Sequence, residues 1–176
     1  MTRASPPSAL AAMVMSTAIS LVPGGVLAQA CTNPQLDPPI SGVLDFGQIY
    51  VTAGLSGTAT LDPATGGIST SGRLVAPQAG SPLSVRVTDA SPDCEFLLTI
   101  TPADREFAAS FTVVADRITV LEGVLLNTDE PQREWLVRLS NGVAPVRIGG
   151  RLEMNTAADG LIDDYLATFT ISVDPS

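Results

Sequence analysis

The fold is decided by Arg147-Ile148-Gly149-Gly150-Arg151-Leu152-Glu153-Met154 and Tyr165-Leu166-Ala167-Thr168-Phe169-Thr170-Ile171-Ser172-Val173, two runs near the end of the chain. In both runs, apolar or small residues alternate with polar or charged ones, which is the pattern of a strand with one buried face. We predict two antiparallel strands joined by a polar connection from Asn155 to Asp164. The chain then ends on a strand that lies inside a sheet.

Further short runs with strand character precede these two, at residues 43–51, 57–61, 68–76, 83–88, 94–101, 111–114, 117–121 and 135–139. Short strands separated by Gly, Pro and Asp turns are typical of a sandwich or barrel, and only residues 103–110 suggest a helical turn. We predict an all-β, Ig-like antiparallel β-sandwich that forms a single domain over residues 42–176. The inward-facing positions predict a core of Phe46, Leu61, Val85, Val87, Phe96, Leu98, Ile100, Val113, Trp135, Val137, Leu139, Ile148, Leu152, Phe169, Ile171 and Val173.

The first 30 residues have the features of a secretory signal peptide. Arg3 precedes an apolar, small-residue stretch, and Ala28-Gln29-Ala30 has the form of a cleavage site. A membrane anchor is the alternative, but Pro23 and two glycines interrupt the stretch before it reaches the roughly 20 residues that a span needs. We therefore predict a signal peptide at residues 1–30, a Pro-rich N-terminal segment at 31–41 and export to the periplasm, the outer surface or the medium.

Composition excludes several classes of function. The formal net charge of −9 argues against nucleic acid and against an anionic membrane surface, since both need a basic patch. The chain has no His, and its nine basic residues are all Arg, so the usual general bases near neutral pH are missing. We predict a protein that is not an enzyme and has no cofactor, no nucleic-acid partner and no membrane span in the mature chain.

The two cysteines, Cys31 and Cys94, are predicted to form a disulfide. Cys94 shares the parity of Phe96 and Leu98, so its sulfur should point into the core, and an exported chain with an even number of cysteines favours pairing. Lipidation of Cys31 is the alternative, with Leu27 one place too far upstream for a good lipidation signal.

A few other residues could carry chemistry. Asp159, Asp163 and Asp164 could form an acid/base pair or a calcium site, but a solvated turn is the favoured interpretation, as it is for Asp129 and Glu130. The glycine pair at 149–150 predicts a bulge or a close backbone approach, and Trp135 is interpreted as core. No catalytic, cofactor-binding or metal-binding residue is predicted.

Four segments together resemble the bacterial domain-of-unknown-function family 4402: Leu44 to Ile49, Gly57 to Gly66, Ile148 to Leu152 and Tyr165 to Val173. The similarity covers about residues 42–173. It implies an exported bacterial β-rich protein related to pilin-like and spore-coat-like sandwiches of surface fibres, and it implies no catalytic residues. The chain departs from the family at Arg151, where a small polar residue is usual, and at residues 161–164.

These observations predict an exported structural protein of the cell surface, such as a fibre or envelope subunit, whose partners are other such subunits. Donor-strand exchange through residues 31–39 is disfavoured, because Pro34, Pro38 and Pro39 lack the N–H groups that a donated strand needs. A secreted binding module for a glycan or protein is the first alternative. A hydrolase that uses paired carboxylates is the second.

Overall fold

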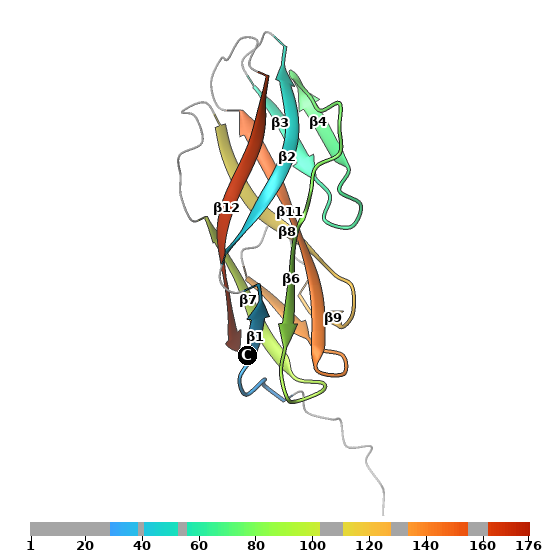
Figure 1. Cartoon of the computed structure of the whole chain (residues 1–176), viewed down its shortest axis with the longest axis vertical. Coiled ribbons are helices and arrows are strands. Elements are labelled where there is room, and N and C mark those ends of the chain that lie inside the picture. Colours follow the sequence, from blue (N-terminus) through green and yellow to red (C-terminus); the bar gives the residue numbers. More distant parts are fainter. Residues whose placement is uncertain (1–28, 39–40, 53–55, 103–110, 128–133, 155–161) are drawn as a thin grey trace, which may run out of the picture.

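The computed structural model describes residues 29–38, 41–52, 56–102, 111–127, 134–154 and 162–176. Every regular element in these residues is a strand, and the strands form two six-stranded antiparallel sheets that pack face to face (Figure 1). No helix that could cross a membrane is found in this part of the chain. The predicted all-β antiparallel sandwich is confirmed.

One layer, the β12 sheet, is built around the last strand. Its order is β5 (Leu74–Val75), β2 (Ser41–Val51), β12 (Ile162–Pro175), β7 (Glu95–Pro102), β10 (Glu134–Arg138) and β9 (Val124–Leu125). Because β12 pairs with β2 on one edge and β7 on the other, it is an inner strand, as predicted. A bulge on β2 includes Gly47, whose φ of 61° is a left-handed conformation that glycine adopts without strain.

The other layer, the β11 sheet, is built around the longest strand of this layer. It contains β1 (Gln35–Asp37), β6 (Leu83–Thr88), β11 (Val143–Met154), β3 (Gly57–Leu61), β4 (Ile68–Gly72) and β8 (Phe111–Val120). Because β8 pairs along one edge of β11, from Val146 to Met154, the strands β6 and β3 share the other edge end to end. They meet at Gly149, the β11 residue between the two ladders.

The core between the sheets follows the predicted parity. Fifteen of the sixteen predicted core residues are buried, and Val173 is half-buried against the same cluster. Phe46, Phe96 and Phe169 are among the largest side chains that are almost completely buried. Burying these surfaces is the main stabilising contribution, at roughly 25 cal/mol per Å² of apolar area.

The predicted hairpin between the last two long strands is wrong. β11 and β12 lie in different sheets, so the connection between them crosses from one layer to the other. The alternating pattern shows which face of a strand is buried. Because both sheets bury one face against the same core, the pattern is the same in both and does not show which neighbouring strand a given strand pairs with. The connection at residues 155–161 and the suggested helical turn at 103–110 lie outside the described residues.

Several strand limits also differ from the prediction. The run 68–76 contains two strands, β4 and β5, that belong to different sheets. β4 ends at Gly72, which has a φ of 66°, and Arg73 separates it from β5. The runs 111–114 and 117–121 join into the single strand β8. The Pro-rich segment supplies β1, three residues between Pro34 and Pro38 that pair with β6, so this segment is part of the chain's own sheet.

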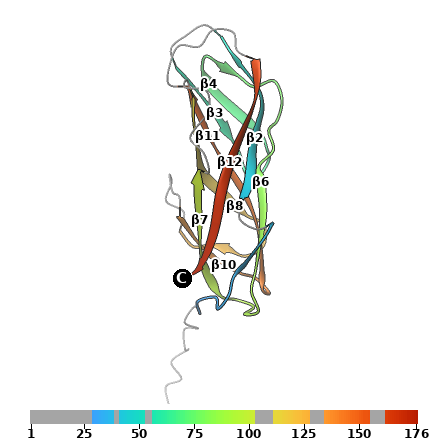
Figure 2. The same ribbon diagram turned by 60° about the vertical axis from the view of Figure 1, so that its left-hand side comes forward.

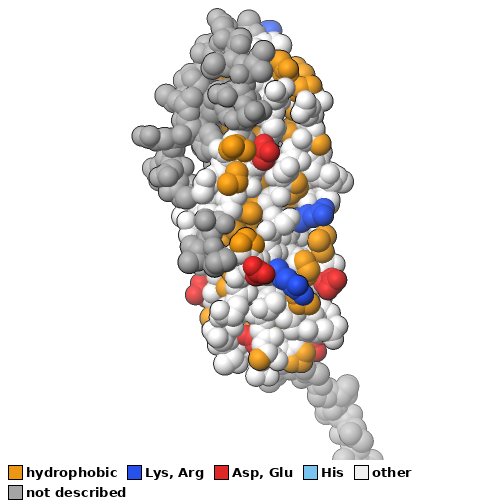
Figure 3. All heavy atoms as spheres, viewed as in Figure 1, with side chains coloured by type: hydrophobic (Ala, Val, Ile, Leu, Met, Phe, Trp, Pro, Cys, Tyr) orange, Lys and Arg blue, Asp and Glu red, His pale blue; other side chains and the backbone are white. Residues whose placement is uncertain are grey.

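The sandwich is elongated, with its strands close to the long axis (Figures 1 and 2). Its longest strand, β12, has 14 residues and would span about 46 Å when fully extended. The first described residues and the C-terminus lie at the same end of the molecule. On the face shown in Figure 3, hydrophobic side chains are interspersed with polar ones and charged side chains are sparse.

Candidate functional site

A bulge in β8 lies opposite the glycine pair of β11. The register shifts between Gly149 and Arg151, so that Ala115 and Asp116 of β8 together face the single residue Gly150. A Cβ on Gly150 would overlap the carbonyl oxygen of Val114, so the glycine permits this close approach of the two backbones. The predicted bulge and close approach are confirmed. The bulge interrupts the alternation of β8 and turns two successive residues, Ala115 and Asp116, away from water.

Asp116 is the charged residue that the bulge buries. Its side chain is 2% exposed and lies between two arginines. Arg117 Nε donates a hydrogen bond of 3.1 Å to Asp116 Oδ1. Arg151 Nε lies 2.8 Å from Asp116 Oδ2 without hydrogen-bond geometry, so that contact is ionic. Arg151 also lies 3.5 Å from the carboxylate of Glu153.

The turn after β3 folds over Gly149. A Cβ at this position would overlap the carbonyl oxygen of Leu61 and the Pro63 ring, so glycine lets the turn lie on β11. Asp62 holds the turn, since its Oδ1 accepts hydrogen bonds from the N–H of Ala64 at 2.7 Å and of Thr65 at 3.3 Å. This is the local bonding by which Asp favours turns.

The turn and β8 border a polar, open pocket on the outer face of the β11 sheet. Its volume is about 510 Å³, and its polar side chains come from Thr60, Asp62, Thr65, Ser69, Arg117 and Thr119. We call it the Arg117 pocket. Arg147 braces its wall by donating a hydrogen bond of 3.0 Å to the carbonyl of Ala64. A volume of a few hundred Å³ is in the usual range for small-ligand sites.

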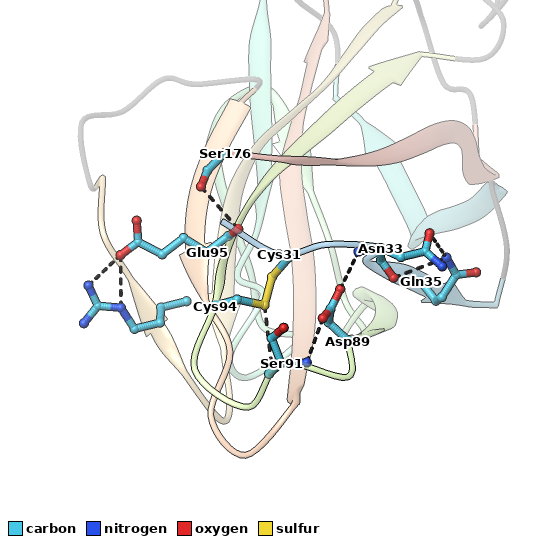
Figure 4. Close-up of a disulfide and its surroundings, with 9 residues drawn as sticks. Cys31, Asn33, Gln35, Asp89, Ser91, Cys94, Glu95 and Ser176 are labelled. Atoms are coloured by element: carbon cyan, nitrogen blue, oxygen red, sulfur yellow. Dashed lines mark hydrogen bonds and ion pairs between the residues drawn. A yellow bond between two sulfur atoms is a disulfide. The ribbon is translucent and has the colours of Figure 1, made fainter. Parts of the chain in front are cut away.

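The predicted disulfide between Cys31 and Cys94 is present in the structure. Both residues are buried at the end of the molecule where the described chain starts and finishes (Figure 4). Here Cys31 N donates to the carbonyl of Glu95 at 2.8 Å, and Ser176 Oγ donates to the same oxygen at 3.2 Å. We call this region the Glu95 pole. Because the Cys31 sulfur is bonded to Cys94, the structure supports the disulfide rather than the lipidated alternative.

Asp89 ties the Pro-rich segment to this pole (Figure 4). Its carboxylate accepts hydrogen bonds from the backbone N–H of Ser91 at 2.8 Å and of Asn33 at 2.7 Å. These two bonds favour the charged form and lower the pKa of Asp89 below 3.8. Asp89 lies near both cysteine sulfurs, but sulfurs joined in a disulfide are not thiolate ligands, so this group does not form a metal site.

The other residues singled out in the sequence divide into two groups. Trp135 is buried in the core at 2% exposure, as predicted. Asp163 and Asp164 belong to β12, but their side chains are outside the description, as are Asp129, Glu130 and Asp159 entirely.

Sequence reasoning missed the Arg117 pocket. A signal for it was present, because the alternating pattern breaks at Ala115 and Asp116 between two otherwise regular runs. A charged residue at such a break, opposite a glycine pair, indicates a bulge that carries polar groups.

No family model, no curated protein and no solved structure matches this chain. The resemblance to family 4402 therefore stays a prediction from the residues, and any function must be argued from the structure.

Proposed function

We propose that this protein is an exported structural protein of the cell surface, a fibre or envelope subunit. The observation that carries the proposal is the disulfide between Cys31 and Cys94, which closes a long stretch of chain into the sandwich. Disulfides persist in oxidising compartments and are rare in the cytosol. The predicted signal peptide ends directly before Cys31. Export would therefore bring this cysteine into an oxidising compartment, where it could pair with Cys94.

The elongated shape supports a structural role. In the part of the chain that the structure describes, twelve strands pack into one narrow sandwich. The first described residues and the C-terminus lie at the Glu95 pole, so the opposite end of the molecule is far from both (Figure 1). A subunit attached at this pole would hold its other end away from the surface. The chain contains no His and no Lys, which agrees with a role that needs no acid/base chemistry near neutral pH.

The test is to locate the protein in its own host with antibodies against the folded sandwich. We expect immunogold labelling of intact cells or of material sheared from them, with protein in which both cysteines resist alkylation until a reductant is added. Recovery of the protein from the cytoplasm with two free thiols would contradict the proposal.

A secreted binding module is the second candidate. It is favoured by one observation, the Arg117 pocket, which gathers a cation, a carboxylate and several hydroxyl groups on one exposed face. An envelope subunit can carry such a site, so the two roles are compatible.

A further inference from the structure

Arg117 lines the pocket, and its guanidinium is bonded through one nitrogen only among the described residues. Its Nε is held by Asp116, and within the described residues its two terminal amino groups have no protein partner. The side chain is 28% exposed, so these amino groups are accessible from the pocket. Two parallel N–H donors in one plane match the two oxygens of a carboxylate.

Stability alone does not explain why Asp116 is buried beside two arginines. Removing a carboxylate from water is costly, and replacing buried ion pairs by apolar groups of similar volume is often neutral or stabilising. A buried carboxylate does, however, fix the direction of a guanidinium that it contacts. Asp116 therefore restrains the guanidinium of Arg117 at the edge of the pocket, and preformed binding sites require such positioning residues.

The remaining polar groups of the pocket suit hydroxyl groups rather than a second charge. Asp62 uses Oδ1 within its own turn, which leaves Oδ2 as an acceptor. Thr65 Oγ1 accepts a bond from the N–H of Gly67 and keeps its own hydrogen for donation. Thr60 and Ser69 add further hydroxyls on the side of β3 and β4, and Ile68 and Ile118 supply apolar surface.

The overall negative charge of the chain does not forbid an acidic ligand here. Exposed charges further away than about 8 Å are largely screened at physiological salt. Near the pocket, the three cations Arg117, Arg147 and Arg151 are matched by three carboxylates, those of Asp62, Asp116 and Glu153, so the local net charge is close to zero. The local charge is therefore much less negative than that of the whole chain.

We propose that the Arg117 pocket binds an acidic sugar unit, a hydroxylated ring that carries one carboxylate. Arg117 takes the carboxylate through its two terminal amino groups, and Asp62 with the pocket hydroxyls takes the ring hydroxyls. This binding is separate from the structural role proposed above and holds whether or not the protein is a fibre subunit.

The test is a titration of the oxidised protein with D-glucuronate and, in parallel, with neutral D-glucose, followed by NMR chemical shifts. A ligand of this size that makes one bidentate ion pair is expected to bind with a Kd of about 1 mM. Glucose should bind at least tenfold more weakly, because it cannot use the paired donors of Arg117. The shifts that saturate with glucuronate should include the Arg117 Nε–Hε signal.

Two variants and one control assign the site. Arg117→Gln should weaken glucuronate binding at least tenfold, whereas Arg86→Gln, which removes the same charge from an exposed position on β6, should leave it unchanged. Asp116→Asn should weaken binding several-fold with Arg117 still present, and glucuronate should no longer shift the Arg117 Nε–Hε signal. Thermal melts show that each variant is folded.

Three results would overturn the proposal. The first is no saturable binding of glucuronate to the folded wild-type protein. The second is equal affinity for glucose and glucuronate, and the third is an unchanged affinity in folded Arg117→Gln.

Discussion

Phe169 is the residue whose truncation tests the architecture most directly. It lies on β12, the inner strand, opposite Gly42 of β2 on one side and Pro102 of β7 on the other, and its side chain is 1% exposed. Truncating a packed aromatic residue costs about 3 to 5 kcal/mol, since the transfer free energy is lost and a cavity remains. Domains of this size have a free energy of unfolding of about 5 to 15 kcal/mol, so Phe169→Ala should remove a large part of it.

The same loss can be expressed as a melting temperature. For a domain of about 150 residues, 1 kcal/mol corresponds to about 2 to 4 °C, so Phe169→Ala should lower Tm by about 6 to 20 °C. Trp135 is the single tryptophan of the chain and is buried. Its fluorescence therefore reports unfolding in guanidinium melts of the oxidised protein.

Thr170→Ala is the matched control, because Thr170 is the next residue on β12 and its side chain is exposed. It should change the free energy of unfolding by less than about 0.5 kcal/mol. If the two variants unfold at the same denaturant concentration, β12 is not an integral inner strand and the reasoning fails.

Three further predictions concern the glycine pair, the disulfide and the Glu95 pole. Gly149→Ala should lower the free energy of unfolding by about 1 to 3 kcal/mol, because its Cβ would overlap the turn that crosses β11. Gly67→Ala, at an exposed position with more space, is the control and should lower it by less in the same denaturant melts. Replacing both Cys31 and Cys94 by Ser should lower the free energy of unfolding by about 4 kcal/mol, the value that the chain-entropy model gives for a sequence separation of 63. An intact mass that shows two free thiols in the native protein would refute the pairing. Because the pKa of Asp89 is lowered in the folded state, its contribution to stability is present above about pH 4 and is lost as pH falls further. Asp89→Asn should therefore flatten the stability profile below about pH 4, and an unchanged acid profile would contradict this.

Much of the sandwich could be predicted from the sequence, because alternation reports burial residue by residue. Phe96 and Leu98, for example, follow directly from parity, and so does the inward direction of Cys94. The partner of each strand could not be predicted in this way. β11 and β12 have the same pattern but lie in opposite sheets, because two sheets that share one core impose the same alternation.

The shortest elements were missed for a different reason. β1 has three residues and β9 has two, too few for a period of two to be recognised. The pocket was missed because its wall is a turn, Asp62 to Gly67, whose residues were interpreted only as a connection. This turn and Arg117 are far apart in the sequence. They come together because β3 and β8 both pair with β11, and this pairing cannot be read from the local sequence.

The meeting of Cys31 and Ser176 at one carbonyl determines how the molecule would carry tension. Both residues donate hydrogen bonds to the Glu95 oxygen, so a pull applied between Cys31 and Ser176 would start with the two points of attachment almost touching. The force would first part the bonds at this end, including the one from Glu95 N to the carbonyl of Gln29, and would peel β12 from its end, one ladder bond at a time, rather than shear the long strands against each other. The disulfide holds the other point of attachment fixed. A load applied to the far end of the sandwich, in contrast, would act along the strands and engage many hydrogen bonds at once.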